Sequence, residues 1–275
     1  MRFAHTFKIA AGALAIAVVA AGCGGGSDKT ATENAADGKL TIGIKFDQPG
    51  LGLQNKDGSF SGFDVDVATY VADKLGVKSG DIKFVESPSA QRETLIENGQ
   101  VDFVVATYSI NDKRKEKVDF AGPYFITGQS FLVRSDNTDI TGPDSLKGKK
   151  VCSVKGSTPA QNIEKNYPET QLQTYDTYSL CLEGLKGKAV DAVTTDAVIL
   201  AGYAAQQPGV FKVVGQPFTT EKYGIGVKKG DTESRNKIND AIESMISSGA
   251  WKAAVEKNFA GVGFEVPTPP TVDRY

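Results

Sequence analysis

Apolar runs of strand length alternate with amphipathic stretches over most of this chain. Residues 40–45, 82–85 and 101–105 have the apolar pattern of strands. Between them, residues 64–76 repeat an apolar position every fourth residue and end on glycine, and residues 89–98 end on Asn-Gly, so both stretches predict helices. The order β-α-β-α-β favours a mainly parallel sheet flanked by helices.

A second series of strands and helices follows. Its predicted strands are residues 150–154, 171–175 and 189–193. Three helices are predicted between and after these strands. The first starts at Pro159 after the N-cap Thr158, the second starts after the N-cap Asp176, and the third starts at residue 197. A further strand at 223–227 and two helices come last, and the apolar stripes of these helices, around Ile242 and Trp251, are interpreted as core. Because this late part does not extend the second series, we expect the chain to cross back and complete the first.

These patterns predict an α/β protein of two lobes, although length alone also allows one large domain. The first lobe is predicted to comprise residues 39–123 and 224–264, and the second residues 129–218. Residues 124–128 and 219–223 would join them as a two-strand hinge. Ligands of open α/β sheets bind beyond the carboxyl ends of the strands, so two facing sheets predict one cleft lined from both sides.

The start of the chain, residues 1–22, has the layout of a secretory signal. A basic start precedes an apolar run over residues 9–21, which is shorter than the roughly 20 residues that a membrane-spanning helix needs. The following Ala20-Ala21-Gly22-Cys23 resembles a bacterial lipobox, which predicts lipidation of Cys23 and a tether to the extracytoplasmic face of the cell membrane. An ordinary signal that is cleaved nearby is the alternative.

Two segments are predicted to lie outside the lobes. Residues 23–38 are small and polar and cannot bury a core, so we interpret them as a flexible linker behind the lipid. Pro267, Pro269 and Pro270 make residues 265–275 a poor helix or central strand, which predicts a tail on the surface.

Composition narrows the classes of function. The formal charge is −2 for the whole chain and about −4 without the signal, and no basic run suggests nucleic acid as a partner. The single histidine, His5, leaves with the signal, so Ser-His and Cys-His pairs and histidine metal sites are excluded. The chain also lacks a phosphate-binding GxxxxGK[ST] loop. Carboxylate or lysine chemistry remains possible, so these absences disfavour an enzyme without excluding one. We expect no enzyme activity and no cofactor.

Cys152 and Cys181 are the cysteines that remain if Cys23 carries the lipid. Exported proteins usually pair such cysteines, and both lie in the same predicted lobe, so we predict a disulfide. It would close a loop of about 30 residues and stabilise by roughly 3 kcal/mol in the chain-entropy model. Two buried free thiols are the alternative.

Polar residues stand at or just beyond the ends of the predicted strands. They are Lys45, Thr107, Arg114, residues 156–158 and Asp196. Arg114 can fork onto a carboxylate, and Asp196 can hold an ammonium. Lys45 and the nearby Arg92 can hold a second carboxylate. This set of charges suits an acidic amino acid.

Three spaced motifs resemble those of the extracellular solute-binding proteins for polar amino acids. They are Gly62-Phe63-Asp64-Val65-Asp66-Val67-Ala68, Asn111-Asp112-Lys113-Arg114 followed by Val118-Asp119-Phe120, and Gly249-Ala250-Trp251-Lys252 with Lys257-Asn258-Phe259. Within that family the chain is most similar to the glutamate/aspartate-binding components of bacterial ABC importers. The resemblance implies the type II periplasmic-binding fold, a two-lobed clamp. We expect a monomer whose partners are the amino acid and the permease subunits.

The resemblance also implies roles for single residues. Arg114 matches the arginine that takes the α-carboxylate, with Ser109 and Thr158 assisting. Thr107 matches a position whose carbonyl or hydroxyl meets the α-ammonium, and Asp196 matches the aspartate that pairs with this ammonium from the other lobe.

The remaining predicted ligand contacts concern the side chain and the second lobe. Arg92 and Lys45 match basic positions of acidic amino-acid binders. Thr195 belongs to the same short motif as Asp196, and the N–H groups of Gly156, Ser157 and Thr158 can hold a carboxylate at a helix start. Relatives often clamp the ligand between aromatic rings, whereas the loop at 46–52 offers only Phe46, so the apolar contacts stay open.

Each of these residues also has an interpretation without a ligand. Arg114 and Arg92 could be ordinary surface arginines, Lys45 could be solvated, and Asp196 could simply cap a helix. Asp64 and Asp66 could pass for a catalytic pair, but we interpret them as residues that favour a helix start and face open water.

The combined expectation is extracytoplasmic capture of L-glutamate, or L-aspartate, by lobe closure and delivery to an ABC import permease. A receptor that reports the ligand to a sensor kinase and a binder that prefers glutamine or asparagine are the alternatives. An enzyme on the same fold, such as a dehydratase, is a third class.

Overall fold

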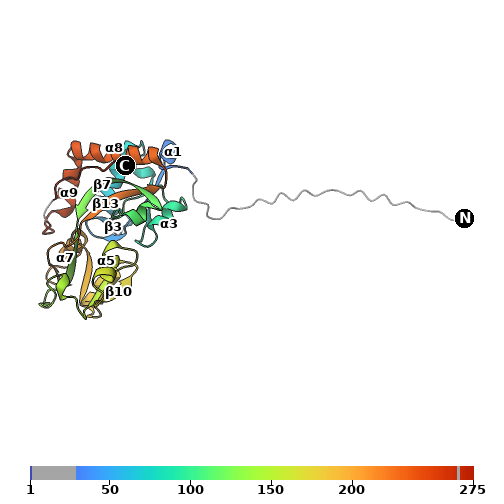
Figure 1. Cartoon of the computed structure of the whole chain (residues 1–275). Coiled ribbons are helices and arrows are strands. Elements are labelled where there is room, and N and C mark those ends of the chain that lie inside the picture. Colours follow the sequence, from blue (N-terminus) through green and yellow to red (C-terminus); the bar gives the residue numbers. More distant parts are fainter. Residues whose placement is uncertain (2–28, 265–266) are drawn as a thin grey trace.

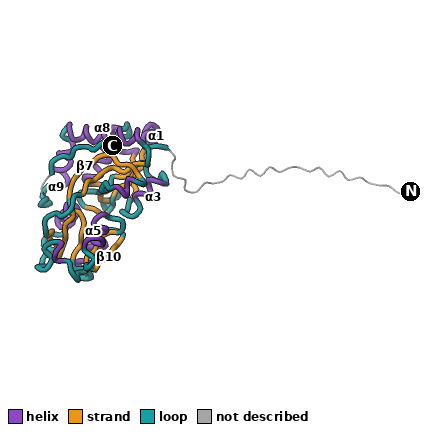
Figure 2. The backbone as a smooth tube through the Cα atoms, viewed as in Figure 1, coloured by secondary structure: helices purple, strands orange, loops and turns teal. Residues whose placement is uncertain are grey.

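The computed structural model describes Met1, residues 29–264 and residues 267–275. Its folded part has two lobes, one above the other in Figure 1, and each is built around a five-stranded sheet. Helices lie on the outside of both sheets (Figure 2). The predicted two-lobed α/β architecture is confirmed.

The sheet of the first lobe combines parallel and antiparallel pairs. Its order is β5 (Ile82–Glu86), β1 (Leu40–Ile44), β6 (Phe103–Val104), β13 (Glu221–Lys228) and β7 (Val118–Thr127). Strand β1 pairs in parallel with β5 and β6, whereas β13 is antiparallel to β6 and β7. Beside it, β2 (Asp47–Gln48), β3 (Gly52–Gln54) and β4 (Phe60–Ser61) form a small antiparallel sheet.

The second sheet repeats this arrangement. Its order is β10 (Gln171–Tyr175), β9 (Lys150–Val154), β11 (Ala192–Asp196), β8 (Gln129–Arg134) and β12 (Phe211–Val214). Strand β9 is parallel to β10 and β11, and β8 is antiparallel to β11 and β12. The expectation of mainly parallel sheets is therefore wrong. A chain that leaves one lobe and later returns must run in opposite directions on the two passages, which adds antiparallel strands to both sheets.

Helices flank both sheets. Those of the first lobe are α1 (Ala31–Ala36), α2 (Phe63–Lys74), α3 (Arg92–Glu97), α4 (Asp112–Lys115), α8 (Thr232–Ser247) and α9 (Ala250–Phe259), with a 3₁₀ turn at Ser79–Asp81. Those of the second are α5 (Thr158–Asn166), α6 (Tyr178–Lys186) and α7 (Ala197–Gln206), with a 3₁₀ turn at Pro143–Ser145. The predicted core stripes of α8 and α9 are buried.

Two strands carry the chain between the lobes. Strand β7 ends at Thr127, and β8 of the other sheet begins two residues later. Strand β13 brings the chain back, and its first residues pair with the end of β7, Glu221 opposite Thr127 and Tyr223 opposite Phe125. The passages are therefore hydrogen-bonded to each other.

Aromatic side chains dominate the core beside these passages. Phe63 lies 5.4 Å from Phe125 and 5.9 Å from Trp251 between ring centroids. The Trp251 indole also donates to the carbonyl oxygen of Tyr124 at 2.7 Å. Each such buried side chain stabilises by about 1.5–3 kcal/mol, so α2 and α9 are fixed to the sheet from which the chain crosses.

Several helix starts use side-chain caps, and two of these caps lie one residue away from the predicted position. Ser157 caps α5 by accepting from Ala160 N–H, where Thr158 was expected. Thr177 caps α6 by accepting from Leu180 N–H, where Asp176 was expected. Asn111 caps α4. Serine, threonine and asparagine are all favoured caps, so neighbouring candidates are separated only by backbone geometry.

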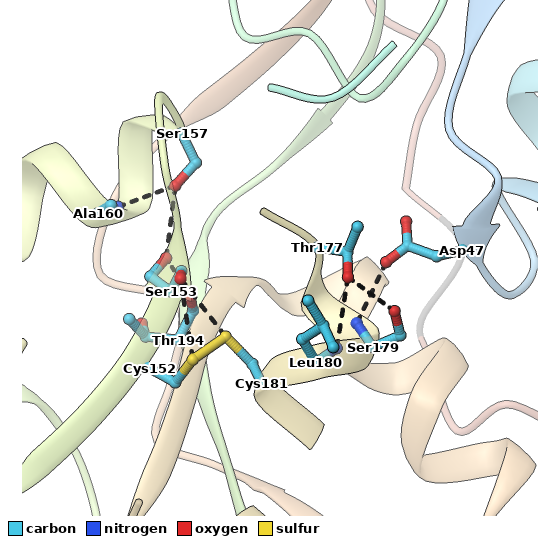
Figure 3. The surroundings of a disulfide bond; sticks show 10 residues. All are labelled: Asp47, Cys152, Ser153, Ser157, Ala160, Thr177, Ser179, Leu180, Cys181 and Thr194. Carbon is cyan, nitrogen blue, oxygen red and sulfur yellow. Dashed lines mark hydrogen bonds between the residues drawn. A yellow bond between two sulfur atoms is a disulfide. The ribbon is translucent and has the colours of Figure 1, made fainter. Parts of the chain in front are cut away.

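The predicted disulfide between Cys152 and Cys181 is confirmed. It links β9 to α6 inside the second lobe, where both residues are fully buried and their Cα atoms lie 5.6 Å apart (Figure 3). The bond holds helix α6 against the sheet, a short distance from the helix start that faces the first lobe.

The flexible linker predicted for residues 23–38 is wrong over residues 30–37, which form a short capped helix. Helix α1 begins at a capping box between Thr30 and Glu33. Its Ala31 and Ala35 are buried, and Thr32 N–H donates to Ser234 Oγ of α8 at 3.0 Å. The small alanines allow the helix to approach the lobe closely. The small, polar composition of the segment did not predict this helix. Cys23 lies outside the described residues.

The end of the chain lies along the edge strand β7. Asp273 N–H donates to the carbonyl oxygen of Gly122 at 2.9 Å, and Phe120 N–H donates to the Tyr275 hydroxyl at 2.9 Å. Arg274 pairs with Glu243 of α8 at 2.8 Å. The segment is a surface strap that covers a sheet edge. Throughout the described part of the chain, no helix has both the length and the apolar character that crossing a bilayer requires.

Candidate functional site

The facing ends of the two lobes touch directly. Arg114 of the first lobe donates through Nη2 to the carbonyl oxygen of Gly156 in the second at 2.9 Å. Thr158 of the second lobe donates to Ser109 Oγ of the first at 3.3 Å. Gly156 has φ 74°, and a Cβ atom there would lie 2.7 Å from Ala90 Cα, so only glycine permits this approach. The lobes are therefore closed on each other.

Three cationic side chains of the first lobe are buried near this contact. Lys45 follows β1, Arg92 begins α3 and Arg114 lies in α4, and their exposed fractions are 5, 2 and 5 %. Burial lowers the pKa of Lys45 well below its usual value, and the Arg92 charge adds to the effect. Burial also lowers the pKa of Arg114 to about 10, again with a contribution from Arg92. These are not surface cations, and their mutual repulsion favours an anionic partner.

Lys45 and Arg92 retain unused hydrogen-bond donors. Lys45 Nζ donates to Ser89 Oγ at 2.9 Å, and an ammonium has three N–H groups. Arg92 Nη1 donates to the carbonyl oxygens of Ala106 and Thr107 at 2.9 and 3.2 Å. Arg92 Nε has no partner within the described residues. Both side chains can therefore donate further hydrogen bonds.

Arg114 is oriented from three sides. Its backbone N–H bonds the Asn111 side chain at 2.9 Å, its Nη1 donates to the carbonyl oxygen of Ser109 at 2.6 Å, and its Nε lies 3.4 Å from Glu93 Oε1. Each Nη atom carries a second N–H. The guanidinium is thus held in place with one free donor on each terminal nitrogen, which is the fork that a carboxylate accepts.

Thr107 and Asp64 form a polar network behind these cations. Thr107 has φ 45°, and its N–H donates to Asp64 Oδ2 at 2.8 Å while its hydroxyl donates to Gln48 Oε1 at 3.1 Å. Tyr124 donates to Asp64 Oδ1 at 2.8 Å, and burial raises the pKa of Asp64 to about 6. The expectation that Asp64 faces open water is therefore wrong, because this carboxylate fixes the loop after β6. Asp66 bonds Lys257 nearer the surface.

Asp196 is the principal group from the second lobe. It ends β11 and precedes α7, but its side chain makes no capping bond. Instead Oδ2 accepts from the Tyr223 hydroxyl, and Oδ1 has no partner in the described part of the chain. Burial raises the pKa of Asp196 to about 8, and the Glu221 charge acts in the same direction. Thr195 beside it is buried, with an unpartnered hydroxyl.

The segment before α5 is partly engaged in its own structure. Ser157 N–H donates to the carbonyl oxygen of Val154 at 3.1 Å, and its hydroxyl caps the helix. Thr158 donates to Glu221 Oε2 at 2.8 Å as well as to Ser109. The predicted cradle of N–H groups therefore has one donor fewer than expected.

Four buried residues at this site escaped the sequence analysis. Gln48 follows Asp47 in the predicted loop, and its Nε2 has no partner among the described residues. Tyr178 is buried in the second lobe; burial and the Asp196 charge raise its pKa to about 12. Tyr108 lies between two predicted residues, and Glu221 lies in a predicted hinge segment. Nothing in the amino-acid sequence marks these four residues as part of a site, except where they lie next to predicted site residues.

A second set of contacts between the lobes centres on Asp47, two residues after Lys45. Asp47 Oδ2 accepts from Ser179 N–H in the first turn of α6 at 3.2 Å, and the Tyr203 hydroxyl donates to the Asp47 carbonyl at 2.7 Å. Figure 3 shows the Asp47 side chain reaching Ser179 beside the disulfide. A Cβ atom on Gly202 would lie 2.3 Å from the carbonyl oxygen of Pro49. We call Asp47, Ser179 and Tyr203 the interlobe latch.

Two further features bear on the kind of ligand. Phe46 packs on Phe60 at 4.9 Å, and Phe60 packs on Phe84 at 5.2 Å, so this ring belongs to a small cluster of the first lobe. Within the described ranges no three Asp, Glu, His or Cys side chains gather as a metal site.

Comparisons with known proteins agree on one family. The profile of the bacterial extracellular solute-binding proteins, family 3, matches residues 40–261. The glutamate-binding protein GluB of Corynebacterium efficiens is 51% identical over 245 residues, which cover 86% of this chain and 82% of that protein. The ABC transporter glutamine-binding protein GlnH of Bacillus subtilis is 34% identical, covering 91% of this chain and 96% of its own. An ancestral arginine-binding protein bound to glutamine superposes with a TM-score of 0.76 and 37% identity, covering 81% of this chain and 98% of that structure.

Proposed function

Because this chain belongs to the bacterial extracellular solute-binding proteins of family 3, we propose that it captures L-glutamate, or L-aspartate, between its lobes for an ABC importer. The observation that carries the proposal is the cluster of three buried cations, Lys45, Arg92 and Arg114, facing the buried carboxylate of Asp196. An acidic amino acid supplies two carboxylates and one ammonium. These are the counter-charges that such a site needs.

The first lobe orients the ligand. Arg114 takes the α-carboxylate through its two free donors, and Ser109 and Thr158 lie beside it. Lys45 and Arg92 take the side-chain carboxylate, since both retain donors that nothing else in the described residues uses. Desolvation strengthens each of these pairs relative to water.

The second lobe completes the binding of the ammonium. Asp196 Oδ1 and the Thr195 hydroxyl have no partner in the described residues, and both are acceptors for an N–H group. A ligand shifts the balance between open and closed lobes only through contacts that are stronger in the closed form. The second lobe makes its ligand contacts only on closing, so Asp196 is the group through which the ligand drives closure.

Glutamine is the competing ligand. One relative is named a glutamine-binding protein, and one solved neighbour holds glutamine. The relative with 51% identity is named for glutamate. An amide side chain would leave Lys45 and Arg92 without a negative charge, and buried unpaired charges are costly. This argument favours the acid over the amide.

Calorimetry with all twenty amino acids tests the proposal. Protein unfolded and refolded to remove any ligand carried from the host should bind glutamate or aspartate at least tenfold more tightly than glutamine. Tighter binding of glutamine would show that the preferred ligand is the amide and not the acid. Release of a new product during prolonged incubation would favour an enzyme, and loss of a cellular response with unchanged uptake after deletion would favour a sensor receptor.

The attachment to the membrane forms part of the same proposal. We infer that Cys23 carries a lipid, that the binding lobes act as a monomer outside the cell membrane, and that the closed form docks on permease subunits. Cys23→Ala should release the protein from the membrane fraction into the medium or periplasm. Retention of the variant in membranes, with an unchanged mass of the mature protein, would contradict the lipid.

A further inference from the structure

Tyr108 lies between the two arginines of the site. It follows β6, and its side chain has no exposed surface. The Arg92 guanidinium carbon is 4.1 Å from the centre of the Tyr108 ring, and that of Arg114 is 4.9 Å from the same point. One aromatic ring therefore contacts both of the cations to which different ligand carboxylates are assigned.

The surrounding structure holds this ring in one position. Phe120 of β7 packs on it edge to face, with centroids 4.8 Å apart. On β13, a Cβ atom at Gly226 would lie 2.7 Å from a Tyr108 ring carbon, so the strand leaves just enough room for the ring. The Tyr108 hydroxyl has no hydrogen-bond partner among the described residues. The ring is thus the part of Tyr108 that contacts both guanidinium groups.

The physical effect of the ring follows from its charge distribution. The face of an aromatic ring is electron-rich and attracts a guanidinium, most strongly where water is excluded. Arg92 and Arg114 are both buried and carry like charges, and the Arg92 charge contributes to lowering the pKa of Arg114. A ring that attracts both cations offsets part of their repulsion and sets where each guanidinium lies.

We propose that Tyr108 is a positioning residue that sets the separation of the two arginines and thereby the selectivity for a ligand with two carboxylates. The proposal rests on the proposed function, because Arg114 is assigned the α-carboxylate and Arg92 the side-chain carboxylate. A ligand with one carboxylate uses only one of the two positions. Loss of the ring therefore weakens binding of glutamate more than binding of glutamine.

The test compares Tyr108→Leu, Tyr108→Met and Tyr108→Phe by calorimetry with glutamate and glutamine. The two variants without a ring should bind glutamate about tenfold to thirtyfold more weakly, and the ratio of glutamate to glutamine affinity should fall. Tyr108→Phe keeps the ring and should restore both values to within about threefold. Phe103→Leu removes a buried ring of the same lobe that contacts neither arginine, and should lower the melting temperature without changing the ratio.

A series of fluorinated phenylalanines at position 108 separates the electrostatic effect from packing. Fluorine withdraws electrons from the ring face while the shape stays nearly constant, so glutamate affinity should fall stepwise with each added fluorine. A flat series, or a glutamate-to-glutamine ratio in Tyr108→Leu equal to that of the wild type, would overturn the role of Tyr108. Failure of the wild type to bind either acidic amino acid would overturn the proposed function itself, and this is measured before any variant.

Discussion

The two lobes contribute to the site in different ways. The first lobe provides Lys45, Arg92 and Arg114, all buried and each oriented by its own contacts. The second provides one carboxylate, Asp196, and a helix start that is partly engaged in its own capping. Under the proposed function, the first lobe selects the ligand and the second lobe responds to it. Selection of a ligand needs charges that are already held in place, whereas ligand-driven closure of the lobes needs contacts that form only in the closed state.

The largest expected effect in this comparison comes from Arg114. Arg114→Leu removes the fork for the α-carboxylate and the bond to the Gly156 carbonyl across the lobes. Truncating one partner of a buried charge pair costs about 5 kcal/mol at the upper end. Calorimetry should therefore detect neither glutamate nor glutamine binding at micromolar concentrations. Arg274→Leu, in the terminal strap, is the control and should bind like the wild type.

Arg92→Leu sharpens the role of the first lobe in selection. It should weaken binding of glutamate by about 2–5 kcal/mol and binding of glutamine much less, because only the acid pairs with this guanidinium. Measured affinities for both ligands give the difference directly. Equal losses for the two ligands would assign Arg92 to the shared α-amino-acid part and not to the side chain.

Asp196→Asn tests the second lobe. The amide is nearly isosteric but lacks the charge that pairs with the ligand ammonium, so the affinity should fall by about 2 kcal/mol. Small-angle scattering with saturating ligand should then show a larger open fraction than in the wild type. If the variant binds weakly but still closes fully, a group other than Asp196 couples ligand binding to closure.

The raised pKa of Asp196 predicts a pH dependence of the ligand-free protein. Between the usual value of 3.8 and about 8, the folded closed form retains a proton that the unfolded chain releases. The unfolding free energy contributed by this group therefore falls as pH rises through that window. Asp64, with its pKa raised to about 6, adds a fall of the same sign over the narrower window between 3.8 and about 6. Denaturant unfolding at several pH values should show a smaller slope in Asp196→Asn.

The interlobe latch has the smallest expected effect. Asp47→Ala removes the carboxylate that accepts from Ser179 N–H and from the Tyr203 hydroxyl. Such bonds to a charged group contribute about 1–2 kcal/mol to the closed form, so glutamate affinity should fall roughly tenfold. Asp176→Ala, which removes only an exposed ion pair with Lys155, is the matched control. Unchanged affinity in Asp47→Ala would mean that the ligand contacts alone stabilise the closed form.

Periodicity by itself determined the two α/β units, and strand-end polarity selected polar residues such as Lys45, Thr107 and Asp196 that the fold buries. Strands such as residues 40–44 and 150–154 are visible because apolar alternation and turn residues are local properties. Cysteine pairing followed from the expected compartment, and the site from where polar residues interrupt apolar runs. Capping positions were one residue off because neighbouring side chains offer similar oxygens.

Only the tertiary structure decided which polar groups are buried and which groups surround each of them. Asp64 was expected in water, yet Thr107 and Tyr124, from distant parts of the chain, enclose it. The antiparallel halves of both sheets depend on the chain passing twice between the lobes. Tyr108 becomes a neighbour of Arg92 and Arg114 only when β6, α3 and α4 meet. Desolvation and charge interactions depend on distances in space, and separation along the sequence does not encode them.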